Sequence, residues 1–122
     1  MRKIFNKKIG VLIFSLVCAG LANAAPVRNA NAAVKLVQNS IIKHGFGGSQ
    51  GIKCMKFYFD ETDDEFQVDV HSDNAKCGGD PGVEPRLFSY TVNKETGGLA
   101  TDNMSYAEDQ GVDWEGDFLP ID

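Results

Sequence analysis

His71 and the acidic side chains near it are the groups in this sequence best suited to chemistry. His71 follows Asp69 by two positions in the alternating segment EFQVDVHS, so both lie on one side of a strand, where a carboxylate can orient an imidazole for general-base catalysis. The nearby Ser72 and Ser89 lie in no recognisable nucleophile turn. We therefore expect no enzymatic role, no catalytic residue and no cofactor.

A second acidic group is the segment DETDDE, which places carboxylates at Asp60, Asp63, Asp64 and Glu65. A helix–loop–helix calcium site needs oxygens at alternate positions followed by a glycine, and this segment lacks that pattern. The chain has two histidines, too few for a zinc site of the usual kind. We expect no metal site here. The segment instead predicts a solvated hairpin loop whose Asp60, Asp63 and Asp64 are candidate contacts for a partner.

Cys54 and Cys77 are predicted to form a disulfide. The third cysteine, Cys18, lies in the apolar N-terminal run and follows Val17, where lipoprotein processing requires a small residue. Removal of that run leaves an even pair in a small exported domain, and such pairs are typically bridged. A redox-active pair usually has its thiols two residues apart, whereas these are 23 apart.

The stretch KCGGDPGVEPR, residues 76–86, combines glycines with two prolines. It lacks the lysine and the following helix of a phosphate-binding loop. Pro81 and Pro85 fix backbone angles, and Asp80 can accept hydrogen bonds from neighbouring amides. The stretch therefore predicts a turn held by the disulfide at Cys77, with Arg86 beyond it placed to meet a carboxylate in the fold or on a partner. Asp80 and Arg86 are further candidate contacts.

The first 24 residues predict a secretory signal peptide: a basic start, an apolar run of about a dozen residues and small residues before a cleavage point after Ala24. The run is too short to span a bilayer, so we expect no membrane anchor. Residues 25–122 then form one small domain with eight basic and seventeen acidic side chains, a net charge of −9. Such a charge disfavours nucleic acid and favours a basic partner, although it also serves solubility alone.

The predicted fold class is α+β, one amphipathic helix on a three- to four-stranded antiparallel sheet. In NAAVKLVQNSIIKHG apolar residues recur at three- and four-residue steps, which predicts a helix capped by Asn31 and ending at Gly45. Alternation predicts strands in KCMKFYFD, EFQVDVHS and RLFSYTVN, and the short LATD could pair as a fourth. The connections are too short for parallel crossovers.

The final acidic segment, residues 105–122, keeps several apolar side chains, among them Trp114. Two interpretations remain open. The segment packs over the open edge of the sheet, or it docks a partner, in which case Trp114 is a contact.

The run HSDNAKCGGDPGVEPRLFSYTVNKETGGL, residues 71–99, resembles a signature of small exported proteins of Gram-negative bacteria, in which CGGDP precedes a proline, an apolar strand and a Thr-Gly turn. More broadly, a helix followed by strands ending in YTVNKETGGL is similar to PepSY-type domains, which occur in the periplasm. That resemblance implies peptidase inhibition or a propeptide role, and it supplies no catalytic residue.

Two functions fit these features. The first is a periplasmic inhibitor or immunity protein that blocks another exported protein, such as a basic cell-wall hydrolase. The second is a stand-alone envelope protein, non-enzymatic, that binds a small ligand or assists folding. The sequence leaves the oligomeric state and the identity of the partner open.

Overall fold

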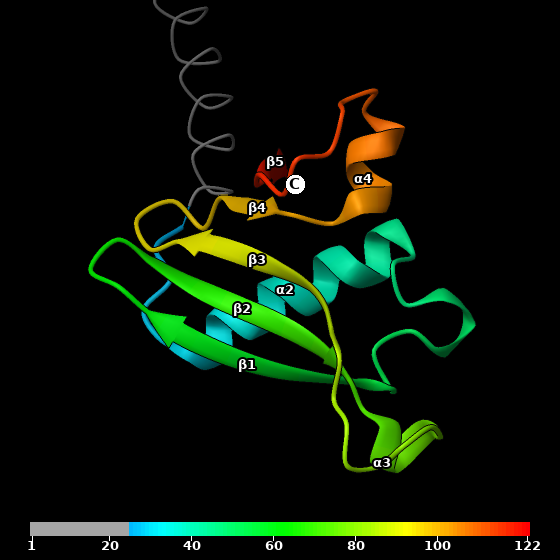
Figure 1. The fold of residues 1–122 in the computed structure, drawn as a ribbon. Coiled ribbons are helices and arrows are strands. Elements are labelled where there is room, and N and C mark those ends of the chain that lie inside the picture. Colours follow the sequence, from blue (N-terminus) through cyan, green and yellow to red (C-terminus); the bar gives the residue numbers. More distant parts are fainter. Residues whose placement is uncertain (1–24) are drawn as a thin grey trace, which may run out of the picture.

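The computed structural model describes residues 25–122, and the predicted signal peptide, residues 1–24, lies outside the described residues. One helix lies behind an antiparallel sheet, so the α+β class is confirmed (Figure 1). The elements are helix α2 (Ala30–His44), the 3-10 turn η1 (Gly48–Gln50), strands β1 (Met55–Glu61) and β2 (Glu65–Ser72), helix α3 (Asn74–Cys77), strands β3 (Arg86–Asn93) and β4 (Leu99–Thr101), helix α4 (Met104–Asp109) and strand β5 (Leu119–Ile121).

Helix α2 is capped two residues earlier than expected. Asn29, not Asn31, is the N-cap, and its side-chain oxygen accepts a hydrogen bond from the backbone N–H of Ala32 at 2.8 Å. The helix ends at Gly45, whose φ of 70° lies in the left-handed region and whose N–H donates to the carbonyl of Ile42. The expected end is confirmed, and the expected cap is wrong.

In the part of the chain that the structure describes, the sheet has five strands in the order β1-β2-β3-β4-β5, each antiparallel to its neighbour. The expectation of three to four strands is therefore wrong. The predicted fourth strand is β4, and β5, which comes from the final segment, pairs with β4 as a fifth. Strand β5 is three residues long with a central proline, and this is too short to show an alternating pattern.

The core lies between α2 and one face of the sheet. Alternation along β2 and β3 directs one set of side chains toward the helix, and these are buried: Phe66, Val68, Val70, Phe88, Tyr90 and Val92. Val37 and Ile41 of α2 are buried against them. The hydroxyl groups of Tyr90 and Ser40 lie 2.9 Å apart inside this layer, and burial raises the pKa of Tyr90 to about 12.

The final segment packs on the domain, as the first of the two interpretations expects. Besides the β4–β5 pairing, the Tyr106 hydroxyl donates to the carbonyl of Pro120 at 3.0 Å. The Asp122 carboxylate accepts hydrogen bonds from the hydroxyl of Ser40 at 2.6 Å and from the ammonium of Lys43 at 3.0 Å. The C-terminal residues are thereby tied to the last turns of α2.

The Cys54–Cys77 disulfide is confirmed, with Cα atoms 5.6 Å apart. It joins the residue before β1 to the end of α3, next to a backbone hydrogen bond of 2.8 Å from Asp73 N–H to the carbonyl of Cys54. In the glycine-rich stretch that follows, the Asp80 carboxylate accepts a hydrogen bond from the N–H of Gly82 at 3.0 Å. The bridge holds this stretch at the end of the β1–β2 hairpin.

Candidate functional site

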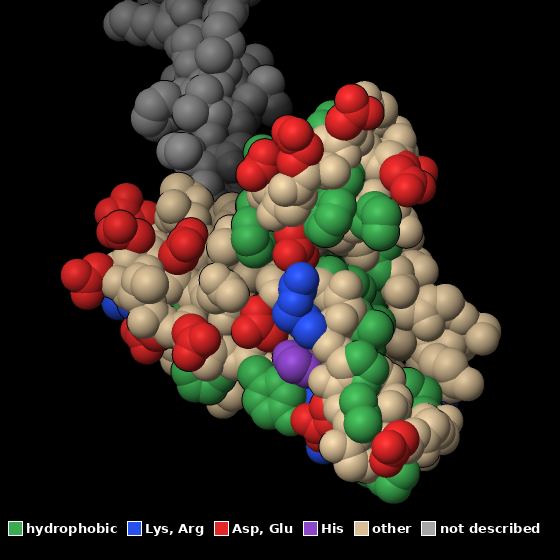
Figure 2. Space-filling model, viewed as in Figure 1, with side chains coloured by type: hydrophobic (Ala, Val, Ile, Leu, Met, Phe, Trp, Pro, Cys, Tyr) green, Lys and Arg blue, Asp and Glu red, His purple; other side chains and the backbone are tan. Residues whose placement is uncertain are grey.

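Helix α2 covers one face of the sheet, and no other described helix covers the opposite one, which we call the open face (Figure 1). Alternation directs a polar set of side chains to it: Lys56, Tyr58, Asp60, Gln67, Asp69, His71, Ser89 and Thr91. Figure 2 shows a basic patch and a histidine in the middle of this side of the molecule, with acidic side chains both directly beside them and along the margins. Most of these polar side chains are linked by hydrogen bonds into two groups.

Glu84 is the centre of the first group. Its carboxylate accepts hydrogen bonds from the ammonium of Lys56 and from the hydroxyl of Tyr58, the latter at 2.6 Å. Its backbone carbonyl lies 2.7 Å from Nδ1 of His71. Because a carbonyl can only accept, Nδ1 carries the proton in this arrangement. The rings of Tyr58 and His71 meet edge to face with centroids 5.1 Å apart.

This group fixes the charge of Glu84. Hydrogen bonds from Lys56 and then Tyr58 hold the pKa of its carboxyl below the usual value. The same bonds to Glu84 raise the pKa of Lys56 and of Tyr58. The carboxylate, the ammonium and the neutral phenol therefore persist together over a wide pH range.

Arg86 is the centre of the second group. Its Nη1 donates to Oδ2 of Asp102 at 3.1 Å and to Oγ of Ser89 at 3.0 Å. Ser89 in turn donates its hydroxyl to Asp69 at 2.6 Å and its backbone N–H to Asp102 at 2.7 Å. The side chain of Asp102 is only 9% exposed. The carboxylate that Arg86 was expected to meet therefore lies within the fold, and it is largely buried.

Asp69 does not pair with His71 in the way that a catalytic base requires. Its carboxylate accepts hydrogen bonds from Ser89 and from the amide of Gln67, at 2.6 and 3.1 Å. Burial raises its pKa, but these two hydrogen bonds, together with the charges of Arg86 and His71, outweigh burial and hold the pKa below the usual value. Ser89 is buried and already donates its hydroxyl. This arrangement fixes a pattern of charge and leaves Ser89 unsuited to act as a nucleophile.

The candidate contact residues are distributed over the molecule. Arg86 and Trp114 are brought together, because the Trp114 indole N–H donates to the backbone carbonyl of Asp102 at 2.7 Å. Asp60 ends the open-face side of β1, and Asp63 and Asp64 form the β1–β2 turn just beyond it. Asp80 is apart from all of these, in the stretch after α3 at the opposite end of the hairpin.

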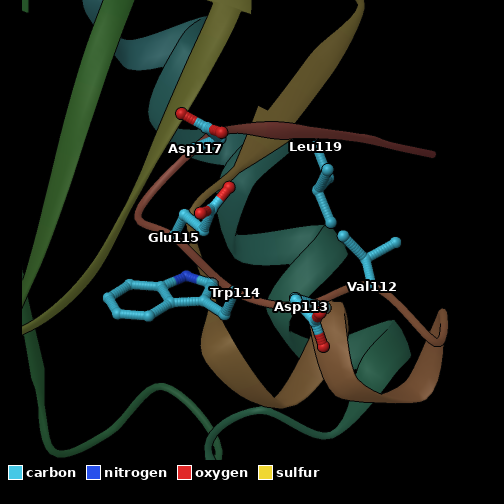
Figure 3. Close-up of a pocket in the computed structure, with 7 residues that line it drawn as sticks. Val112, Asp113, Trp114, Glu115, Asp117 and Leu119 are labelled. Atoms are coloured by element: carbon cyan, nitrogen blue, oxygen red, sulfur yellow. The ribbon is translucent and has the colours of Figure 1, made fainter.

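A small pocket lies beside Trp114 between α4 and β5, with a volume of about 100 Å³ (Figure 3). Val112 and Leu119 point toward one another there, and the indole of Trp114 extends away from them. Acidic side chains also line it: Asp113, Glu115 and Asp117. The volume suits one side chain and is well below that of a typical small-molecule site.

Sequence reasoning missed four members of the two groups: Lys56, Tyr58, Glu84 and Asp102. The alternation in KCMKFYFD does indicate that Lys56 and Tyr58 lie opposite the apolar side chains of that strand. No comparable signal marks Glu84, which lies in the glycine-rich stretch, or Asp102, which follows a three-residue strand.

Within residues 25–122, no helix has the length and apolar character needed to cross a membrane, and no three His, Cys, Asp or Glu side chains gather in a way that could hold a metal ion. Comparison with protein-family models, curated proteins and solved structures finds no match to this chain. Function is therefore inferred from the geometry of the open face and its surroundings.

Proposed function

We propose that this chain is an exported inhibitor or immunity-type protein that binds and blocks another exported protein, such as a cell-wall hydrolase, through the open face of its sheet. The observation that carries the proposal is the pre-arranged polar surface on that face. Arg86 is fixed there by Asp102 and Ser89, and Glu84 fixes the side chains around Tyr58. The disulfide between Cys54 and Cys77 fits an exported protein.

Pre-arrangement favours binding because little side-chain freedom is lost when the partner arrives. Two aromatic side chains on or beside this face remain accessible, Tyr58 at 45% and Trp114 at 42%. Tyr and Trp are the side chains that most often anchor protein–protein interfaces. We therefore assign Tyr58 and Trp114 as anchors and Arg86 as the central charge.

The partner's charge follows from the acidic surface. The described chain carries eight basic and seventeen acidic side chains, a net charge of −9. A basic partner would be attracted over a distance of about 8 to 10 Å at physiological salt, and the association rate would fall as salt rises. Asp60, Asp63 and Asp64 are our candidates for meeting its cationic surface first, whereas Asp80 belongs to this proposal only as a peripheral contact. The resemblance to PepSY-type domains implies peptidase inhibition or a propeptide role, and the first of these agrees with this proposal.

The test is retention of a partner from periplasmic extract on the immobilised, oxidised protein at about 50 mM salt, with elution at about 500 mM. The Asp60→Asn/Asp63→Asn variant should lose retention. The matched control, Glu108→Gln/Asp109→Asn, removes the same charge from α4 and should keep it. The eluted protein should then be inhibited by the wild-type chain in a cell-wall hydrolysis assay. Absence of any salt-sensitive partner, or equal loss with both variants, would contradict the proposal.

The alternative, a stand-alone envelope protein that binds a small ligand, is favoured by one feature. A shallow depression of about 300 Å³ lies beside α2, lined by apolar Val27 and Leu36 together with Lys35, Thr96 and Gly97. This volume is at the lower limit for ligand pockets. If the alternative is correct, an apolar fluorescent probe should bind there, and Leu36→Arg should abolish its binding without affecting partner retention.

A further inference from the structure

Within residues 25–122, strand β1 leaves one long edge of the sheet without a neighbour. It is the outer strand in the order β1-β2-β3-β4-β5 and runs for seven residues, Met55–Glu61 (Figure 1). The opposite outer strand, β5, has three residues and a central proline. A short edge with a proline is protected against pairing, whereas a long regular edge presents N–H and C=O groups to another strand.

The hydrogen bonds to β2 show which β1 groups point outward. At the two ends of the hairpin, Asp73 N–H donates to Cys54 and Thr62 N–H donates to Glu65. Hydrogen-bonded pairs alternate with non-bonded pairs along an antiparallel ladder, and Cys54 and Thr62 both have even numbers. The even-numbered residues of β1 are therefore the ones whose backbone groups bond to β2. The odd-numbered Phe57 and Phe59 therefore direct both of their backbone groups to the free edge.

We propose that two copies of this chain pair through β1, antiparallel, about a two-fold axis at Tyr58. In that register Phe57 of each copy lies opposite the partner's Phe59, and the two exchange N–H···O=C bonds. The outward-pointing set maps onto itself, since Met55 then faces the partner's Glu61. Of these end residues, Met55 offers only its carbonyl, because its N–H donates to the carbonyl of Ile52 at 3.2 Å. The result is a continuous ten-stranded sheet.

Charge complementarity favours a second copy of this chain as the partner of the free β1 edge, and it fixes the register of the pairing. With the axis at Tyr58, Lys56, whose ammonium also donates to Glu84 of its own chain, lies opposite the partner's Asp60 on both sides of the axis. Moving the axis to Phe57 or Phe59 keeps the backbone pattern but removes this pairing. An axis at Lys56 or Asp60 would place like charges opposite one another, which is destabilising.

The side chains near the axis are accessible in the single chain. Phe59 is 52% exposed and Tyr58 is 45% exposed. Pairing would bring Phe57 and Phe59 of the two copies together on the α2 side, and aromatic cross-strand pairs stabilise sheets. Just beyond the strand, the same register places Asp63 opposite the partner's Lys53.

Pairing about this axis keeps both open faces on the same side of the joined sheet, because opposed residues in a sheet point the same way. The inference does not rest on the proposed function, although Tyr58, Asp60 and Asp63 belong to both surfaces. A contact of this length is at the small end of protein interfaces, so we expect micromolar association.

The test is sedimentation velocity of the exported, oxidised protein from about 5 to 500 µM, a range chosen to bracket a micromolar dissociation constant. Wild type should become dimeric. Lys56→Asp and Asp60→Lys should each be monomeric alone, because each creates like-charge pairs. A mixture of the two variants should form a heterodimer, since each Asp at positions 56 and 60 of one variant then faces a Lys of the other. Asp109→Lys, which makes the same charge change as Asp60→Lys on α4, should dimerise as wild type does.

A second variant separates backbone pairing from charge. Phe59→Pro removes an N–H that the β1–β2 ladder does not use, so the fold should persist, by circular dichroism, while the dimer is lost. A wild-type protein that is monomeric at about 500 µM would overturn the proposal. So would single charge variants that dimerise as wild type does, or a mixture that stays monomeric.

Discussion

Reduction of the Cys54–Cys77 disulfide should lower the melting temperature substantially. The bridge closes a loop with a sequence separation of 23 residues. The chain-entropy model gives about 3.4 kcal/mol at 25 °C for a loop of that length. The described domain has 98 residues, for which the unfolding entropy is about 0.21 kcal/mol/K. The expected loss is therefore about 16 °C, and a loss of about 2 kcal/mol would still give about 10 °C.

The effect should act mainly through the unfolded chain. The two cysteines are held close without the bridge, because Asp73 N–H bonds to Cys54 and Lys76 N–H bonds to the Asp73 carboxylate at 3.1 Å. The reduced protein should therefore remain folded at 25 °C with unchanged circular dichroism. Hydrogen exchange should increase first in residues 73–85, the segment that the bridge holds against the hairpin.

The assay is differential scanning calorimetry with and without reductant. The Cys54→Ser/Cys77→Ser variant should melt at the temperature of the reduced wild type and should not respond to reductant. A reduced wild type that melts within about 2 °C of the oxidised form would refute the reasoning, because less than about 0.5 kcal/mol would then come from closing the loop.

Three further predictions concern the polar contacts. Asp102→Ala leaves the buried Ser89 N–H without its acceptor and should cost about 2 to 3 kcal/mol in urea unfolding, whereas Asp102→Asn keeps an acceptor and should cost less. Ser40→Ala leaves the buried Tyr90 hydroxyl unpaired and should cost about 1 to 2 kcal/mol in the same assay, with Asn39→Ala, which changes an exposed residue beside it, as the near-neutral control. Burial raises the pKa of Asp122, but hydrogen bonds from Ser40, His44 and Lys43, together with the charge of His44, outweigh burial and leave the pKa below its usual value. The ionised Asp122 therefore contributes stability that is complete above about pH 4 and is lost as the pH falls further. Asp122→Asn should remove this contribution and so flatten the pH dependence of the melting temperature between about pH 4 and 2.

The parts of the fold that sequence predicts are those with a strong local pattern. Alternation in EFQVDVHS fixes which side of β2 is buried, and the three- and four-residue steps fix the buried side of α2. The position of the N-cap of α2 depends on a tertiary contact as well as on local sequence. Asn29 and Asn31 are equivalent by residue type, and the choice follows from the N–H of Val27, which bonds to the carbonyl of Lys94 at 2.8 Å and so fixes where the chain enters the helix.

The open-face groups depend on contacts that no local pattern encodes. The register between β2 and β3 shifts at Val70 and His71, and this irregularity brings Arg86 opposite His71. Asp102 reaches Arg86 only because β4 pairs with β3. Glu84 reaches across to β1 from a glycine-rich stretch whose path the disulfide constrains. Sequence therefore indicates the polar side of each strand, whereas partners across the sheet come from tertiary structure.

The disulfide and the Glu84 group act on the same strand, and this connects them to the proposed pairing of β1. An edge strand with one neighbour tends to fray. Here Cys54 anchors the start of β1, and Glu84 holds Lys56 and Tyr58 from the open face. Such anchoring keeps the outward groups of Phe57 and Phe59 in strand geometry before a partner arrives, which lowers the cost of pairing. Reduction should therefore weaken the dimer at 25 °C, where the monomer is still folded, and Glu84→Ala should weaken it with the bridge intact. If sedimentation shows unchanged dimerisation both after reduction and in Glu84→Ala, then neither the disulfide nor Glu84 is needed to keep β1 ready for pairing.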